Sequence, residues 1–434
     1  MGVNNLLAQL KKLYPKNFSH SYFGMYDALY IEMNPILHKV LRTKNTSQTL
    51  VLQTFLNDVK DYLESILKHF LAKRVVCIFD GFASNSKLKE QTNRKKDVLE
   101  LTSAVNIAHI APNTKTMIEV EKSVNDVLES TRALFLLHKY EFEIISSNVI
   151  GEGEIKLMNH LNTHYEIGKK MAILSVDSDL ILLSILSRAQ SDITIIFQAK
   201  RGSELMLDVK GLCDNIKSTL LNNIRKNPIE YLNKKRTLSN EFLAKIDDRR
   251  LLLDYSTVCL FRGNDYLPSL YGSGYLKDFD IYSQAFIYRN LCQDPNIKYL
   301  CGLDLIGNVY ENSINKAFFE TYIWLYQQTI NDTFVLYKNV VSTLDKNLII
   351  NYIEGLNWCM NLYLNCVYTD FEYECTAKFQ NGTSDSINAT FICSQFSCLG
   401  LEPIIKNKKV TLNIPDESVL RKKHFSDEWI KILY

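Results

Sequence analysis

Acidic residues stand where apolar runs meet turns at five places along the chain. Two of these places carry a pair of acids, in the motifs GEGE and DSD, and each of the others carries one. Buried like charges repel each other, and an isolated buried carboxylate would take up a proton. Divalent cations among the carboxylates would make such a cluster tolerable, so the pattern predicts metal-assisted phosphoryl chemistry. The seven acids are Glu32, Asp80, Glu152, Glu154, Asp177, Asp179 and Asp265.

The number and type of these ligands suit two divalent ions, which lie about 3.5–4 Å apart in centres of this kind. One ion would generate the attacking hydroxide, and the other would stabilise the leaving oxygen. Carboxylate-only ligation favours Mg²⁺ or Mn²⁺ over zinc. Each motif taken alone has a plainer explanation: Asp177 or Asp179 could cap a helix, and Glu152 and Glu154 could begin a solvated one.

Zinc has weaker support in the sequence. His160 and His164 have the i, i+4 spacing of a helical zinc pair, but Leu161 stands where the HExxH motif needs Glu. We therefore expect a solvated helix face at these histidines. The 10 cysteines include no CxxC pair, which favours reduced cysteines in a cytoplasmic protein over a zinc knuckle.

Short apolar runs alternate with helical patterns in the first two-thirds of the chain. This alternation predicts an α/β fold, with a mainly parallel central sheet flanked by helices. Sites in such sheets form beyond the carboxyl ends of the strands, where Glu32, Asp80 and Asp177 stand. We therefore expect the acids to converge. The predicted strands are residues 28–33, 74–79, 142–146, 171–176 and 193–199, and helices at residues 49–70 and 122–140 lie among them.

The length of 434 residues predicts one large domain, residues 1–275, followed by a smaller helical and aromatic-rich region, residues 276–434. We expect a solvated insertion or helical excursion at residues 201–250 and a buried helix at 251–261. Long helices are expected at 314–328 and 348–368. From about residue 376, short β-like runs mix with polar loops.

The composition, 46% hydrophobic and 23% charged residues, is that of a folded soluble protein. The net charge of +2 means that any nucleic-acid binding must use local patches. The sequence contains no run of 18 apolar residues and no recognisable signal peptide, so we expect neither a membrane span nor secretion.

Several motifs resemble those of the XRN-type 5′→3′ exoribonucleases, within the wider superfamily of flap-endonuclease-like and PIN-like nucleases. The motifs occur in the family's order, and the resemblance spans about residues 1–370. GEGExKxM combined with GNDxLP is quite specific for this family. The matching segments are IEMNPILH (31–38) to LDMNSILH, FDGFA (79–83) to IDGVAP, GEGEIKLM (151–158) to GEGEHKIM, VDSDLILL (176–183) to LDADLIML, RGNDYLPSL (262–270) to VGNDFLPHL, and YIEGLNW (352–358) to YVEGLQW.

The resemblance implies that the first 275 residues form a metal-dependent nuclease core and that all seven acids are metal ligands. Glu32 departs from the family, which carries Asp at that position, and its extra methylene displaces the carboxylate. The resemblance further implies that His38 stacks on a base and that Asn34 belongs to the same substrate-binding segment. A compact member of this kind would suit a virus or a reduced eukaryote.

A basic segment after Asp80 matches the family's pocket for a 5′-monophosphate. Its members lie at i, i+4, i+7 and i+8, which places them on one face of a helix. Lys95 stands where the family has Arg, so the bidentate contact with phosphate is lost. The alternative is a solvated basic helix face. The four residues are Lys87, Gln91, Arg94 and Lys95.

The expected function is therefore a Mg²⁺-dependent 5′→3′ exoribonuclease that degrades single-stranded RNA bearing a 5′-monophosphate. One alternative is a structure-specific DNA nuclease of the flap-endonuclease kind, which would share the acids. The segment after Asp265 favours the RNA branch, because it lacks a clear helix–hairpin–helix turn. A second alternative is a catalytically inactive RNA-binding scaffold, for which Glu32 is the evidence.

Overall fold

The computed structural model describes residues 3, 5–20, 25–44, 51–87, 105, 109–134, 140–198, 204–226, 228–231, 234–267, 269–270, 275–306, 309–330, 346–374 and 386–387. The chain divides into two compact units. The sheet unit contains Lys16–Lys210 and Phe371–Tyr373, and the helical unit contains the residues up to Pro15 together with Gly211–Asp370. The boundary expected near residue 275 falls inside the helical unit.

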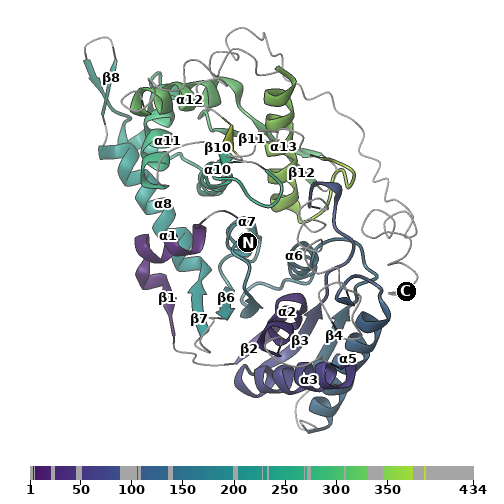
Figure 1. The fold of residues 1–434 in the computed structure, drawn as a ribbon. Helices are drawn as coiled ribbons and strands as arrows, with labels where there is room; N and C mark the ends of the chain where they lie inside the picture. The colour runs from purple at the N-terminus through teal and green to yellow at the C-terminus, as the bar shows by residue number, and fades with distance from the viewer. Residues whose placement is uncertain are drawn as a thin grey trace. The chain divides into compact units, whose positions relative to one another are not determined.

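The sheet unit is built on a seven-stranded sheet with the order β1-β7-β6-β5-β2-β3-β4 (Figure 1). The neighbouring strands from β6 to β4 are parallel, whereas β7 pairs antiparallel with β6, and β1 antiparallel with β7. The five predicted strands and the α/β class are confirmed. The strands are β1 Phe18–Ser19, β2 Tyr26–Glu32, β3 Ala72–Ile78, β4 Glu141–Ile145, β5 Met171–Ser175, β6 Ile193–Gln198 and β7 Glu204–Asp208.

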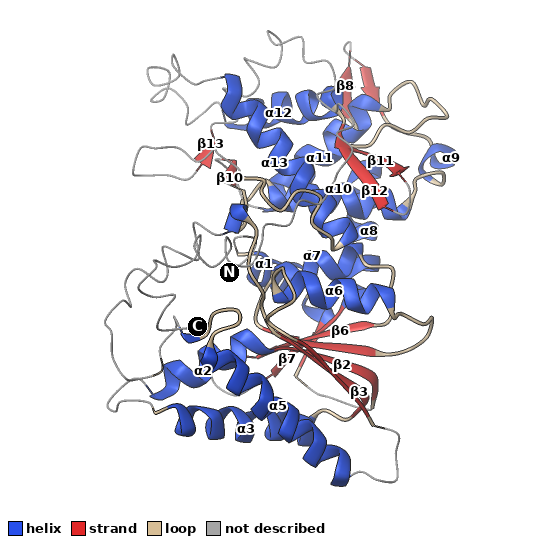
Figure 2. Cartoon of the chain, turned by 90° about the vertical axis from the view of Figure 1, so that its right-hand side faces the viewer, coloured by secondary structure: helices blue, strands red, loops and turns tan. Residues whose placement is uncertain are grey.

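Helices cover both faces of this sheet (Figure 2). One face carries α2 (Met33–Lys44), α3 (Leu52–His69) and α5 (Lys115–Leu134), which share a hydrophobic core with the strands. The other face carries α6 (Gly153–Thr163) and α7 (Asp179–Leu186). Every residue of α7 is buried, as expected for a helix that is apolar on all sides. Near-continuous apolar strands fit a sheet covered on both sides.

The helical unit contains longer helices and short hairpins. Its α8 begins at the end of the sheet unit and buries an apolar stripe that includes Leu212, Ile216 and Leu220. For residues 201–250 we expected either a solvated insertion or a helical excursion. At α8 the helical excursion is confirmed and the solvated insertion is wrong. The elements are α1 Leu6–Leu13, α8 Val209–Lys226, β8 Ile229–Tyr231, β9 Lys234–Arg236, α9 Asn240–Leu243, α10 Asp248–Leu260, β10 Ser269–Leu270, α11 Tyr275–Arg289, β11 Cys301–Ile306, β12 Val309–Ile314, α12 Lys316–Ile330, α13 Lys346–Asn365 and β13 Ser386–Ile387, with a 3₁₀ turn at Pro15–Asn17 between the units.

Asparagines of α13 complete the hydrogen bonding of strand β12. Asn357, Asn361 and Asn365 accept backbone N–H groups of alternate residues of β12 at 3.0, 2.6 and 3.1 Å. The i, i+4, i+8 spacing puts the three amides in one row on the helix. They satisfy backbone donors that a strand edge would otherwise expose, which fixes α13 against the hairpin β11–β12.

A buried carboxylate joins α10 to α11 and β11 in the same unit. Asp254 accepts the hydroxyl of Tyr282 at 2.7 Å and the N–H groups of Leu300 and Cys301, both at 2.8 Å. Burial raises the pKa of Asp254 to about 6, against the lowering effect of these hydrogen bonds. Asp254 therefore has a structural role, which its position within an apolar helix did not indicate. Among the described residues, none of the helices combines the length and apolar character needed to cross a membrane.

Candidate metal centre

Three of the predicted acids converge beyond the carboxyl ends of adjacent strands in the sheet unit. Glu32 ends β2, Asp80 follows β3, and Glu154 lies in the first turn of α6. One carboxylate oxygen from each lies within 4.8 Å of the others. Three oxygens of this kind match the ligands that Mg²⁺ and Mn²⁺ prefer. The donor set therefore fits a divalent cation held by Glu32, Asp80 and Glu154.

The glycines of the GEGE motif allow α6 to begin against these acids. The N–H of Gly153 donates to Asp80 Oδ1 at 2.7 Å. A Cβ at position 153 would lie 2.6 Å from that oxygen and 3.4 Å from Cγ of Glu32. Gly151 has a φ of 106°, which side chains disfavour. The glycines of the GEGE motif are therefore needed for the backbone conformation, and its glutamates supply the carboxylates.

The DSD motif is joined to Glu32 by a hydroxyl group. Ser175, the last residue of β5, donates to Glu32 Oε2 and accepts the N–H of Asp177 at 3.0 Å. Asp177 Oδ1 in turn accepts the N–H of Asp179 at 2.9 Å. The N-cap of α7 is Ser178, whose side chain makes no capping bond. Asp177, one residue earlier, instead binds the N–H of the first residue of the helix. Asp179 is buried.

Lys87 supplies positive charge to the glutamates of the GEGE motif. Its ammonium contacts Glu152 and lies 3.0 Å from Glu154 Oε1. Lys87 is buried, so the alternative of a solvated basic face is wrong for this residue. The other members of the predicted phosphate pocket, Gln91, Arg94 and Lys95, lie outside the described residues.

The segment that carries Lys87 is bonded to residues that follow α13. Asn85 donates its backbone N–H to Phe371 O at 3.1 Å and its side-chain amide to Glu372 O at 3.0 Å. Ser86 donates its hydroxyl to Tyr373 O at 2.5 Å. A distant part of the chain therefore helps to hold the start of the predicted phosphate pocket.

The electrostatics of the cluster oppose full ionisation. Burial, followed by the charges of Glu154 and Asp80, raises the pKa of Glu32 well above its usual range. Burial and then Glu154 also raise the pKa of Asp177. Burial raises the pKa of Glu152, although Lys87 acts in the opposite direction. Like charges that must share a buried site need a cation to ionise together.

Asn34 and His38, the two predicted substrate-binding residues of α2, differ in what they contact. Asn34 is buried, and its Oδ1 accepts the backbone N–H of Asp80 at 3.0 Å. It therefore orients a candidate ligand, and contact with substrate stays a prediction. His38 is half-buried on α2, one helical turn further on, and its stacking with a base also stays a prediction.

Asp265 belongs to the helical unit, so its part in the metal centre stays a prediction. It is buried within a turn that Asn264 builds, because Asn264 Oδ1 accepts the N–H groups of Tyr266 and Leu267 at 3.0 and 2.8 Å. The amide of Asn264 donates to Tyr363 Oη in α13 at 3.1 Å. The turn is therefore bonded to α13, the helix that carries the YIEGLNW motif, and the ring of Tyr266 lies 5.4 Å from that of Trp358 in the motif.

The histidine pair differs from expectation, because His160 is buried and only His164 is exposed. Glu143 of β4 explains this: its Oε1 lies 3.0 Å from His160 Nε2, and its Oε2 accepts Arg74 at 2.5 Å. Burial nevertheless lowers the pKa of His160, which Glu143 partly offsets. The prediction of a solvated face is therefore wrong for His160.

Lys156 is a residue near the site that the sequence analysis did not single out. It donates to the carbonyls of Ser146 and Val149 at 3.1 and 2.8 Å, and thereby ties α6 to the loop before the GEGE motif. Burial lowers its pKa to about 8 against the raising effect of Asp80. The sequence could have marked Lys156 by its position in the GEGEIK motif, one helical turn after Glu152.

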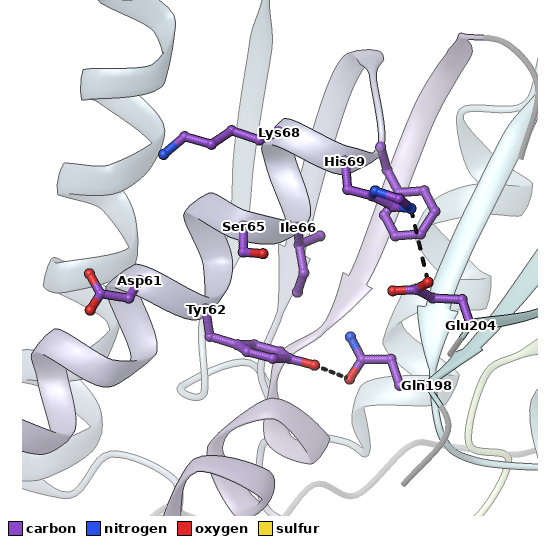
Figure 3. Close-up of a pocket in the computed structure, with 9 residues that line it drawn as sticks. Asp61, Tyr62, Ser65, Ile66, Lys68, His69, Gln198 and Glu204 are labelled. Atoms are coloured by element: carbon purple, nitrogen blue, oxygen red, sulfur yellow. Dashed lines mark hydrogen bonds and ion pairs between the residues drawn. The ribbon is translucent and has the colours of Figure 1, made fainter. Parts of the chain in front are cut away.

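A separate pocket of about 650 Å³ lies beside α3 in the sheet unit. Tyr62 reaches across it to Gln198 at 2.8 Å, and His69 lies 3.9 Å from Glu204 (Figure 3). None of the residues that line it belongs to the predicted site.

The fold and the triad define an α/β protein with a candidate carboxylate metal centre at the carboxyl edge of a parallel sheet. Residues 1–101 and 95–198 match the sequence model of the family described as XRN 5′-3′ exonuclease N-terminus. The first 198 residues of the chain are therefore similar to the N-terminal region of XRN 5′-3′ exonucleases.

Two curated relatives show a similarity of the same kind. 5′-3′ exoribonuclease 1 of Schizosaccharomyces pombe is 22% identical over 301 residues, covering 63% of this chain and 22% of that protein. 5′-3′ exoribonuclease 2 of Arabidopsis thaliana is 21% identical over 307 residues, covering 56% of this chain and 30% of that protein. The match thus spans less than a third of either relative.

Solved structures give a fainter likeness. The catalytic core of Rad2 in complex with DNA substrate is 12% identical, with a TM-score of 0.42 over 85% of this chain and 88% of that chain. The T5 D15 protein co-crystallised with metal ions is 15% identical, with a TM-score of 0.26 over 61% of this chain and 88% of that chain.

Proposed function

We propose that this protein is a divalent-metal-dependent 5′→3′ exoribonuclease that acts on single-stranded RNA with a 5′-monophosphate. The observation that carries the proposal is the convergence of Glu32, Asp80 and Glu154 within 4.8 Å, in a chain whose first 198 residues match an exonuclease family. Mg²⁺ or Mn²⁺, two ions in the full centre, would supply an activated water and stabilise charge at the scissile phosphate.

The protein's own groups would prepare this centre. Glu32, Asp80 and Glu154 would hold the cation, and Glu152, Asp177 and Asp179 of the same unit would complete the ligand set. The N–H groups of Gly153 and Asp80 support the arrangement, since the first binds Asp80 Oδ1 and the second binds Asn34.

Among the residues that the structure describes, Lys87 gives the best support for recognition of a 5′-phosphate. Its ammonium is held next to the metal ligands by Glu152 and Glu154, so a phosphate bound there would lie close to the centre. Lys binds phosphate as a point charge. We propose that Gln91, Arg94 and Lys95 extend this pocket and that His38 stacks on the base. A 5′-hydroxyl carries no charge and would gain no such attraction from the ammonium.

The test is a degradation time course on 3′-labelled RNA bearing either a 5′-monophosphate or a 5′-hydroxyl, with Mg²⁺ present. Single-stranded and flapped DNAs of the same sequence run beside it. We expect loss of the monophosphorylated RNA, with mononucleotides as products and the hydroxyl form spared. Cleavage of the flapped DNA alone would refute the proposal and favour a structure-specific DNA nuclease.

Two variants connect the activity to the site. Asp80→Asn keeps the size of the side chain but removes its charge, and we expect at least about a 100-fold loss of rate, since even outer residues of a metal site cost 10–100-fold. Asp61→Asn, at an exposed position on α3, is the matched control. Equal rates for both variants would contradict the proposed centre.

A further inference from the structure

Ser175 occupies a bridging position between Glu32 and the DSD motif. It is buried at the end of β5, next to β2 in the sheet. Its hydroxyl proton goes to Glu32 Oε2, and its oxygen accepts the N–H of Asp177 at 3.0 Å. A serine hydroxyl has one proton to donate, so these two bonds fix its orientation.

The hydrogen bond gives the two oxygens of Glu32 different surroundings. Oε2 is bound to Ser175, whereas Oε1 lies on the side of Gly153, 3.7 Å from the position that a Cβ would take there. Asp80 Oδ1 faces the same position from 2.6 Å. Glu32 Oε1 and Asp80 Oδ1 therefore lie on the same side, near Gly153, whereas Oε2 is bound to Ser175.

We propose that Ser175 is a positioning residue that makes Glu32 a ligand through one oxygen. Its hydroxyl occupies Oε2 and directs Oε1 towards Asp80 and Glu154. This bond is what allows the longer glutamate to serve where the resemblance to the family implies aspartate. The inference rests on the proposed metal-dependent function and adds a specific residue to it.

The same hydroxyl also binds the N–H of Asp177, so Ser175 could instead matter through the DSD turn. A double-mutant cycle separates the two effects, because coupled residues depart from additivity and independent ones do not. The Glu32→Asp side chain is one methylene shorter, and its carboxylate ends away from the hydroxyl. In the Glu32→Asp protein the hydroxyl of Ser175 no longer bonds to residue 32. Replacing Ser175 there removes only its bond to the N–H of Asp177.

The experiment measures the Mn²⁺ dissociation constant of the full-length protein by electron paramagnetic resonance, with the metal alone. The variants are Ser175→Ala, Ser175→Thr, Glu32→Asp and the double variant Glu32→Asp/Ser175→Ala. We expect Ser175→Ala to weaken Mn²⁺ binding about ten-fold, as loss of an orienting hydrogen bond does in other metal sites. Ser175→Thr keeps the hydroxyl and should restore binding. In the Glu32→Asp background, removing the hydroxyl should have little further effect.

Three results would overturn the assignment. The first is an unchanged Mn²⁺ affinity in Ser175→Ala. The second is the same loss in both backgrounds, which would place the effect in the Asp177 turn. The third is no Mn²⁺ binding by the wild-type protein, which would also remove the proposed metal centre. A wild-type protein that binds Mn²⁺ but degrades no RNA would refute the exoribonuclease while leaving the role of Ser175 intact. Thermal unfolding of each variant checks that it is folded.

Discussion

Replacing Lys87 with Met should destabilise the sheet unit strongly and yet favour metal binding. The side chains of Lys87, Glu152 and Glu154 are 9%, 2% and 5% exposed. Removing one partner of a buried ion pair costs about 3–5 kcal/mol, because the remaining charge is left uncompensated. For a unit of this size, 1 kcal/mol corresponds to roughly 2–4 °C, so the melting temperature should fall by about 6–20 °C.

A divalent cation should reverse part of this loss. Glu154 belongs to the triad and also pairs with Lys87, so the ammonium and a cation compete for the same carboxylate. Without Lys87, Mn²⁺ should bind more tightly and raise the melting temperature more than it does in the wild-type protein, since a ligand stabilises in proportion to ln(1 + [L]/Kd).

Differential scanning fluorimetry of both proteins over a Mn²⁺ titration is the assay. Lys68→Met is the matched control, because the Lys68 side chain is 72% exposed and pairs with Glu64 one turn away, and such pairs contribute about 0.3–0.5 kcal/mol. The reasoning would be refuted if Lys87→Met had the same melting temperature as the Lys68→Met control. It would also be refuted if Mn²⁺ raised the melting temperature of Lys87→Met less than that of the wild-type protein.

Three further changes have definite expected outcomes. Gly153→Ala should abolish RNA degradation without unfolding α6, because its methyl group would lie 2.6 Å from Asp80 Oδ1 while Ala favours helix; wild-type rates would contradict this. Asn264→Ala should lower the free energy of unfolding by about 1–3 kcal/mol, because two backbone donors lose their acceptor, as urea denaturation would show. Mn²⁺ should raise the melting temperature more at pH 7.5 than at pH 5.5, and equal shifts would count against a metal held by Glu32.

The sign of the pH effect follows from the raised pKa of Glu32 and Glu152. A carboxyl group whose pKa is higher in the folded protein than in the unfolded chain stabilises the fold while it is protonated. That contribution is present at acid pH and is lost as the pH rises through the folded-state pKa. Above that pH the ionised cluster needs a counter-charge, and a cation no longer has to displace protons.

The parallel sheet could be predicted from local signals, and so could the convergence of Glu32 and Asp80 at its edge. Continuous apolar runs marked the strands from β2 to β6, and these two acids stood where strands ended. The antiparallel strand β7 was missed because it lies in a charge-rich stretch beside the sheet edge. The structural role of Asp254 was also missed, since its partners Tyr282, Leu300 and Cys301 come from later segments with no local mark.

Glu32 shows why a departure from a family motif has to be judged against the backbone opposite it. One extra methylene should displace a carboxylate, and on sequence alone this was the evidence for an inactive protein. In the structure Cγ of Glu32 lies beside Gly153, 3.4 Å from where a Cβ would stand, and Ser175 donates a hydrogen bond to Oε2. A side chain at position 153, or an apolar one at 175, would leave the same glutamate misplaced. The proposed role of Glu32 therefore depends on residues more than a hundred positions away, which no local pattern around Glu32 could reveal.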